Sequence, residues 1–180
     1  LNYDLLNLET IGLGANIEFC IVDYGSKNKI REDIRIDKKS TTVKFIELDF
    51  TTSEEVDYHV SKAFNIGLKN VTGEYCMITG SDQFLSANAW YNLINLLKNK
   101  KTENLSNEEY YYIPRKQFSS NFDFKTVSYS QLDTLINSIA FSRFSFRNLK
   151  HSIGAGAGAL LASRHNFEKV GYFNEAWGGY

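Results

Sequence analysis

The sequence is poor in proline and cysteine, with one proline and two cysteines in 180 residues. A single proline gives no support for a hinge between domains, and no linker or repeat divides the chain, so its length indicates one domain. Cys20 and Cys76 lie far apart, each inside an apolar run. This pattern favours reduced, buried thiols over a disulfide framework or a metal knuckle, and it indicates a protein of the cytoplasm.

The chain also lacks an excess of charge and a long apolar run. Its 20 basic and 21 acidic residues leave a net charge of −1, so we expect no nucleic-acid partner and no attraction to an anionic membrane surface. No apolar stretch approaches the roughly 20 residues of a membrane-spanning helix, and the first residues show no basic stretch leading into an apolar one. We therefore expect no transmembrane segment in this chain.

Common enzyme motifs are missing as well. There is no G-x-S-x-G nucleophile elbow and no G-x-x-x-x-G-K-[ST] loop, which excludes the commonest hydrolase and P-loop interpretations. Residues 154–159 match the letters of the G-x-G-x-x-G/A dinucleotide fingerprint, but no strand precedes them and an apolar run follows. These small residues are better explained by a chain that passes close to a ligand or to a packed helix.

Apolar runs and helical stripes alternate along the first half of the chain. The expected elements are a helix near residues 5–13, strands at 17–22 and 43–48, a helix over 56–68 capped at 51–53, a strand at 74–79 and a helix after Ser86. In the second half we expect strands at 110–114 and 157–162 and a helix at 129–141. Repeated strand-helix-strand units produce a mostly parallel sheet with helices on both faces, so the predicted fold class is α/β.

Two loops directly follow predicted strands. Ligands of parallel α/β sheets bind beyond the carboxyl ends of the strands, so these loops are the places to examine. In the first loop, the Asp23 carboxylate can accept hydrogen bonds from a planar base, and Gly25 lets the backbone approach a ligand. The alternative, favoured on local grounds, is a turn in which Asp23 bonds nearby backbone N–H groups.

The second loop contains Gly80, Ser81 and Asp82. A hard divalent cation that bridges two phosphates takes oxygen ligands, usually one or two carboxylates completed by water and phosphate oxygens. Asp82 is a candidate for such a ligand. A turn aspartate that faces solvent explains the residue equally well on local grounds, because no second acid stands beside it.

Taken in order, these segments resemble the large family of GT-A glycosyltransferases often called family 2, whose members build polysaccharides, lipopolysaccharides and glycolipids. Residues 18–26 resemble the family's strand ending in Asp-Asp-Gly-Ser, whose acids contact the base and ribose, with Tyr24 in place of the second acid. Residues 64–68 and 72–75 resemble its Arg-Asn-x-Gly and Ala-x-Gly-Glu-Tyr stretch, with Phe64 where an arginine is frequent.

Two further segments complete the resemblance. Residues 80–82 are similar to the family's Asp-x-Asp, but they keep only the last acid, which in the family ligates the metal. Residues 171–180 resemble its Gly-Gly-Phe-Asp-Glu segment, most of all in chondroitin-polymerase-like galactosyltransferases. That segment shapes the acceptor side and leads into a Glu-Asp pair that supplies the general base. The resemblance therefore implies that Glu175 lies near the acceptor and that the base follows Tyr180.

The resemblance implies a single GT-A domain, a nucleotide-diphospho-sugar transferase fold, over residues 1–180, without its first strand and its C-terminal end. The implied activity moves a sugar from a nucleotide-diphosphate donor, with a UDP-sugar favoured, to a glycan or lipid-linked acceptor. We expect inversion, a requirement for Mn²⁺ or Mg²⁺, and a role in surface polysaccharide synthesis in the cytoplasm or at the inner face of the membrane.

The resemblance also assigns the site residues. It places Asp82 on the metal and makes Glu175 a residue that shapes the acceptor side. If the general base lies within the chain, Glu175 is the first candidate for that catalytic role. The residues expected to contact the nucleotide-sugar are Asp23, Ser26, Asn65, Gly80, Ser81 and Asp82. Two other functions remain open. The missing acid at Gly80 motivates a non-catalytic GT-A-like domain that binds a nucleotide or a glycan, and a sugar nucleotidyltransferase would use a similar α/β scaffold.

Overall fold

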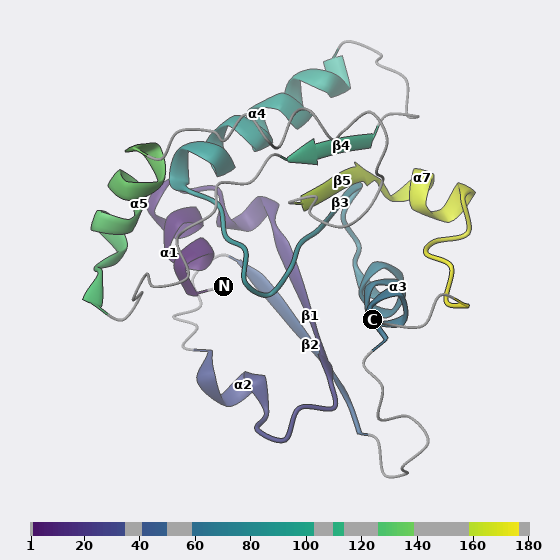
Figure 1. Cartoon of the computed structure of the whole chain (residues 1–180). Coiled ribbons are helices and arrows are strands. Elements are labelled where there is room, and N and C mark those ends of the chain that lie inside the picture. Colours follow the sequence, from purple (N-terminus) through teal and green to yellow (C-terminus); the bar gives the residue numbers. More distant parts are fainter. Residues whose placement is uncertain are drawn as a thin grey trace.

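The computed structural model describes residues 2–34, 41–49, 59–102, 110–113, 126–138 and 159–176. This part of the chain forms a mixed α/β fold (Figure 1). Its strands are β1 (Glu18–Tyr24), β2 (Thr42–Leu48), β3 (Tyr75–Ile78), β4 (Tyr110–Ile113) and β5 (Ala159–Ser163). Its helices are α1 (Asn2–Thr10), η1 (Gly14–Asn16), α2 (Ile30–Asp33), α3 (Val60–Asn70), α4 (Ala87–Thr102), α5 (Tyr129–Ser138) and α7 (Arg164–Lys169).

The strands pair in two groups. β1 and β2 are parallel, with Glu18 opposite Thr42 and Tyr24 opposite Leu48. β5 lies between β3 and β4 and is antiparallel to both. The predicted α/β class is therefore confirmed as mixed α/β, but the prediction of a mostly parallel sheet is wrong for the described strands. β3 pairs with a strand from far along the chain, and the local order of elements does not reveal such a pairing.

Two buried cores lie on opposite faces of β3. The first core consists of Leu8, Leu85, Trp90 and Ile94, with Phe19 and Met77 packed against it. The second core consists of Leu68, Cys76, Ala162 and Phe167. Cys76 and Met77 are neighbours in a strand, so their side chains point to opposite faces. The first core contains residues of α1 and α4 and the second contains residues of α3 and α7, so helices pack against both faces of β3.

Helix starts agree with the sequence in one case and differ in another. The Ser86 hydroxyl accepts the backbone N–H of Ala89 at 3.2 Å, so Ser86 caps α4 as predicted. α3 begins at Val60, where the ring of His59 accepts the N–H of Lys62. The predicted cap at residues 51–53 lies outside the described residues, as do the glycines of the run at 154–159. No helix among the described residues is long and apolar enough to cross a bilayer.

The two cysteines are free thiols. Cys76 is buried, as predicted, whereas Cys20 is only half-buried. Burial raises the pKa of both thiols above its usual value. Because the thiolate is the reactive form, the raised pKa disfavours nucleophilic chemistry by both thiols at neutral pH, and the Cys76 side chain packs in the second core.

Glu18 links the start of β1 to the segment between α3 and β3. One carboxylate oxygen accepts the backbone N–H and the hydroxyl of Thr72, each at 2.8 Å. The other oxygen lies 3.1 Å from the Lys44 ammonium. Burial alone would raise the pKa of this carboxyl, but the hydrogen bonds from Thr72 and the charge of Lys44 outweigh it, and the pKa is lower than usual. The folded state therefore favours the ionised carboxylate.

Glu18→Gln should lower the free energy of unfolding at pH 7 by about 1 kcal/mol, because the substitution removes the charge from these hydrogen bonds. The lowered pKa means that the contribution of Glu18 is fully present above about pH 4.5, the usual value, and is lost as the pH falls through the lowered pKa. Urea unfolding at several pH values measures both effects. The exposed Glu32→Gln is the control, and equal acid sensitivity of the two variants would contradict the assignment.

Candidate nucleotide and metal site

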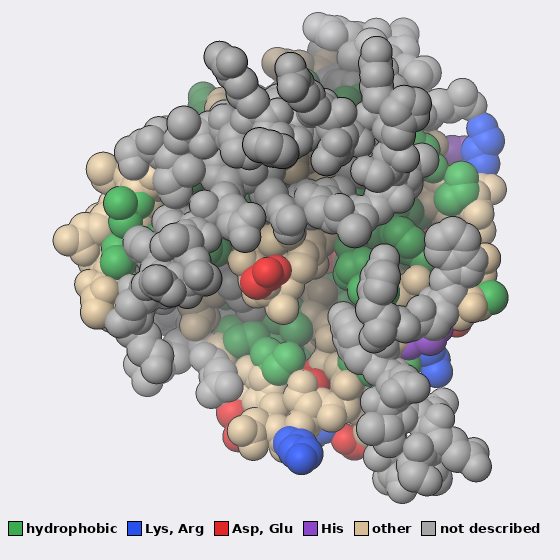
Figure 2. Space-filling view, in the orientation of Figure 1, with side chains coloured by type: hydrophobic (Ala, Val, Ile, Leu, Met, Phe, Trp, Pro, Cys, Tyr) green, Lys and Arg blue, Asp and Glu red, His purple; other side chains and the backbone are tan. Residues whose placement is uncertain are grey.

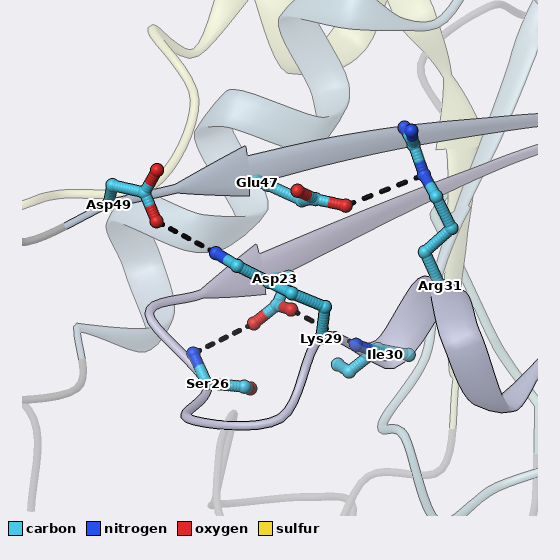
Figure 3. Close-up of polar contacts among 7 residues, drawn as sticks. All are labelled: Asp23, Ser26, Lys29, Ile30, Arg31, Glu47 and Asp49. Atoms are coloured by element: carbon cyan, nitrogen blue, oxygen red, sulfur yellow. Dashed lines mark hydrogen bonds and ion pairs between the residues drawn. The ribbon is translucent and has the colours of Figure 1, made fainter.

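The first candidate loop lies at the carboxyl ends of β1 and β2, at the lower edge of the molecule in Figure 1. Asp23 is 2% exposed. Its Oδ1 accepts the N–H of Ser26 at 2.9 Å, and its Oδ2 accepts the N–H of Ile30 at 3.3 Å (Figure 3). Gly25 has φ +74°, the left-handed conformation that this sharp turn requires. Asp23 therefore holds the whole loop from β1 to α2.

The fold favours the ionised form of the Asp23 carboxyl group. Burial alone would raise its pKa, but hydrogen bonds from Ser26 and Ile30, together with the charge of Lys29, lower it below the usual value. These contacts match the local alternative for Asp23, a turn in which the carboxylate accepts hydrogen bonds from nearby backbone N–H groups. A direct contact between Asp23 and a nucleotide base stays a prediction. The neighbouring residues 25–28, which include Gly25 and Ser26, are all exposed.

Basic side chains that the sequence analysis did not single out stand beside this loop. Lys29 forms an ion pair with Asp49 at 2.7 Å, and the Arg31 guanidinium lies 3.4 Å from Glu47 and over the ring of Phe45 (Figure 3). Charged side chains of both signs accordingly gather at the lower end of the face in Figure 2. The signal in the sequence is a basic residue at every second position of 27–31.

The second candidate loop connects β3 to α4 and bends toward the centre of the molecule in Figure 1. Gly80 accepts the N–H of Gln83 in a tight turn, and the Gln83 side-chain oxygen in turn accepts from the Gly80 N–H and the Thr79 hydroxyl. A Cβ atom at position 80 would stand 2.7 Å from Oδ1 of Asp82. The Asp82 carboxylate therefore folds back over Gly80, into space that any larger residue would occupy.

The oxygen atoms of this loop suit a cation that is held mainly by phosphate oxygens and water. Asp82 and Ser81 are both exposed and offer oxygen, which suits Mn²⁺ or Mg²⁺. Within the described residues, no three His, Cys, Asp or Glu side chains gather in a group that could hold a metal. A metal here would therefore have Asp82 as one protein carboxylate and would depend on phosphate oxygens and water for the rest.

The structure brings together two predicted residues that lie 110 positions apart. Asn65 is 3% exposed, and its amide nitrogen donates to the Glu175 carboxylate at 2.7 Å. Asp23 is also in contact with Ser26, whereas residues 80–82 lie on a different loop, the one between β3 and α4. The predicted residues thus form three groups, on the loop after β1, on the loop after β3, and between α3 and the segment after α7.

No protein-family model matches this sequence, and none of the curated proteins matches it either. The functional interpretation therefore depends on the residues themselves, on their order along the chain and on the geometry of the three groups.

Proposed function

We propose that this chain is a GT-A-type glycosyltransferase domain that transfers a sugar from a UDP-sugar to a glycan or lipid-linked acceptor, with inversion, in the cytoplasm. The observation that carries the proposal is the position of Asp82. It is an exposed carboxylate in the loop after β3, and its Oδ1 folds back over Gly80 into space that a Cβ atom would occupy. Its order in the chain, after the Asp23 loop and before Glu175, is that of the resembling family.

The proposed roles come from the resemblance, and the contacts within each group support them. Asp82 would hold the divalent cation, which when bound neutralises charge on the diphosphate of the leaving nucleotide. Asp23 keeps the loop after β1 in one conformation, so that Gly25 and Ser26 present backbone and hydroxyl groups to the nucleoside. Glu175 presents a carboxylate on the acceptor side. A general base must reach the acceptor hydroxyl on the side opposite the leaving phosphate, and neither Asp23 nor Asp82 is placed for that role in this proposal.

A thermal-shift screen tests the proposal. A ligand that binds only the native state raises the midpoint of unfolding, so UDP and UDP-sugars with Mn²⁺ should raise it more than ADP or GDP do. Equal shifts for all three nucleotides would argue against a uridine site. Release of pyrophosphate from a nucleoside triphosphate and a sugar phosphate would instead support a nucleotidyltransferase.

One observation favours a second function, a non-catalytic domain that binds a nucleotide or a glycan. Gly80 leaves Asp82 as the single carboxylate of its turn. The two functions differ in product. Incubation of the protein with a labelled UDP-sugar and a mixture of acceptor oligosaccharides gives labelled oligosaccharide and free UDP only if it transfers sugar, whereas a binding domain raises the unfolding midpoint without forming product.

The Gly80 turn gives a direct test of the metal assignment. Gly80→Ala should weaken Mn²⁺-dependent UDP binding by roughly threefold to tenfold, because the new Cβ displaces the Asp82 carboxylate from its position. The free energy of unfolding should change by only about 0.5 kcal/mol, since the turn is at the surface. Calorimetric titration measures the first effect and urea unfolding the second. Unchanged metal-dependent binding would show that the position of Asp82 is irrelevant to the metal.

A further inference from the structure

We infer that Asn65 is a positioning residue that holds Glu175 and its segment, and that it does not contact the nucleotide. The role of Glu175 toward the acceptor rests on the proposed function, but the contact between the two side chains does not. Asn65 lies in α3 and is almost completely buried, while Glu175 is exposed. Their hydrogen bond therefore joins a fixed side chain to a surface carboxylate.

The hydrogen-bonding capacity of the Asn65 amide explains the inference. Its nitrogen carries two hydrogens, and it donates to the Phe173 carbonyl at 2.9 Å and to Oε1 of Glu175 at 2.7 Å. Its oxygen accepts the Phe173 N–H at 2.9 Å. Both donors are thus engaged and the side chain is shielded from solvent. No amide hydrogen therefore remains for the nucleotide-sugar, the ligand that the resemblance assigned to this residue.

The segment that contacts Asn65, residues 171–175, begins with a tight turn after α7. Gly171 and Tyr172 have φ +76° and +66°, so the chain takes two successive left-handed residues after α7. Their N–H groups bond the carbonyls of Glu168 and Phe167. A left-handed tyrosine is sterically unfavourable. The Lys69 ammonium, 5.2 Å from the centre of the Tyr172 ring, helps to compensate.

Aromatic packing fixes the same segment from a second side. The ring of Phe173 lies 5.6 Å from that of Phe64 and 6.2 Å from that of Phe167, centre to centre. Phe64, Asn65 and Lys69 all belong to α3, so one helix supplies packing, hydrogen bonds and a charge to residues 171–175. A side chain held by a rigid helix keeps its geometry better than one held by a loop.

An amide donor suits this task because it orients a carboxylate without neutralising its charge. Glu175 is exposed and accepts a hydrogen bond through Oε1. Its other oxygen, Oε2, accepts none from the described residues. The free oxygen is therefore available to a hydroxyl group. A lysine or arginine in place of Asn65 would pair with the charge and weaken the carboxylate as an acceptor.

Hydrogen exchange followed by NMR on the whole chain tests the pairing, with the N–H of Ala176, which bonds the Asn174 side chain, as the reporter. Asn65→Asp replaces both donors by acceptors, and the Ala176 N–H should exchange about tenfold faster. The double variant Asn65→Asp with Glu175→Gln reverses donor and acceptor between these two side chains at unchanged net charge, while the hydrogen bond to the Phe173 carbonyl stays broken. It should therefore recover part of the lost protection, with exchange at least about threefold slower than in Asn65→Asp alone. Double-variant exchange as fast as in Asn65→Asp alone would overturn the inference.

Two further measurements separate this inference from its alternatives. Glu175→Ala should speed exchange of the Asn65 side-chain amide about tenfold while the exposed control Glu168→Ala leaves it unchanged, and this test remains valid if Asn65→Asp fails to fold. UDP with Mn²⁺ should bind Asn65→Asp within about twofold of the wild type, whereas a loss of tenfold or more would return Asn65 to the nucleotide site. A wild type that does not bind UDP overturns the proposed function but leaves the exchange result intact.

Discussion

Asp82→Asn should weaken Mn²⁺-dependent binding of UDP at least tenfold, or about 1.4 kcal/mol. The substitution keeps the size of the side chain but removes the charge that a hard cation requires. Asp82 is exposed, so the free energy of unfolding without ligand should stay within about 0.5 kcal/mol of the wild type. Calorimetric titration with UDP in the presence of Mn²⁺, compared with titration in the presence of a chelator, measures the effect.

The matched control for Asp82→Asn is Glu168→Gln. Glu168 is also an exposed carboxylate, but it lies on α7 and pairs with Arg164. The Glu168→Gln variant should bind UDP with unchanged affinity and unchanged metal dependence. If Asp82→Asn retains the metal dependence of the wild type, the cation is not held by Asp82 and the assignment fails.

Asp23→Ala should have the largest effect on stability, a loss of about 2–4 kcal/mol in the free energy of unfolding. The substitution removes two hydrogen bonds to a buried charge and leaves the N–H groups of Ser26 and Ile30 without their acceptor. Asp23→Asn keeps one oxygen acceptor and should lose about half as much. Urea unfolding at pH 7 measures both variants.

The acid dependence of Asp23 provides a second check. Its pKa is lowered in the folded state, so its contribution is fully present above about pH 3.8, the usual value, and disappears as the pH falls through the lowered pKa. Asp23→Ala should therefore flatten the loss of stability in acid. Asp49→Asn, at a carboxylate that is 78% exposed, is the control and should cost at most about 1 kcal/mol. A cost for Asp23→Ala as small as that of the control would show that the loop does not depend on its buried carboxylate.

Local features of the sequence predicted local features of the fold. The strands β1, β2 and β3 appear where apolar runs predicted them, and Ser86 caps α4 as expected. A cap and a strand are decided by neighbouring residues and by burial, both of which a pattern records. The local interpretation of Asp23 was also correct as far as it went, because its oxygens bond N–H groups only three and seven residues away.

Long-range features were beyond such patterns. The antiparallel pairing of β3 with β5 joins residues such as Cys76 and Ala162, and the contact of Asn65 with Glu175 spans 110 positions. Both depend on how the second half of the chain folds back over α3. In the sequence, a polar residue such as Asn65 on a helix was compatible with a ligand contact as well as with a buried positioning role. Only its burial and its three hydrogen bonds distinguish the two.

Calorimetric titration of the wild-type chain with UDP, first with Mn²⁺ and then with a chelator, is the most direct measurement of the central claim. The proposed function predicts binding with Mn²⁺ that weakens at least tenfold in the chelator, with ADP and GDP at least tenfold weaker than UDP. Such a result would require both a uridine site and a cation between protein and diphosphate. The absence of UDP binding, or equal binding of the three nucleotides without regard to metal, would contradict the proposal.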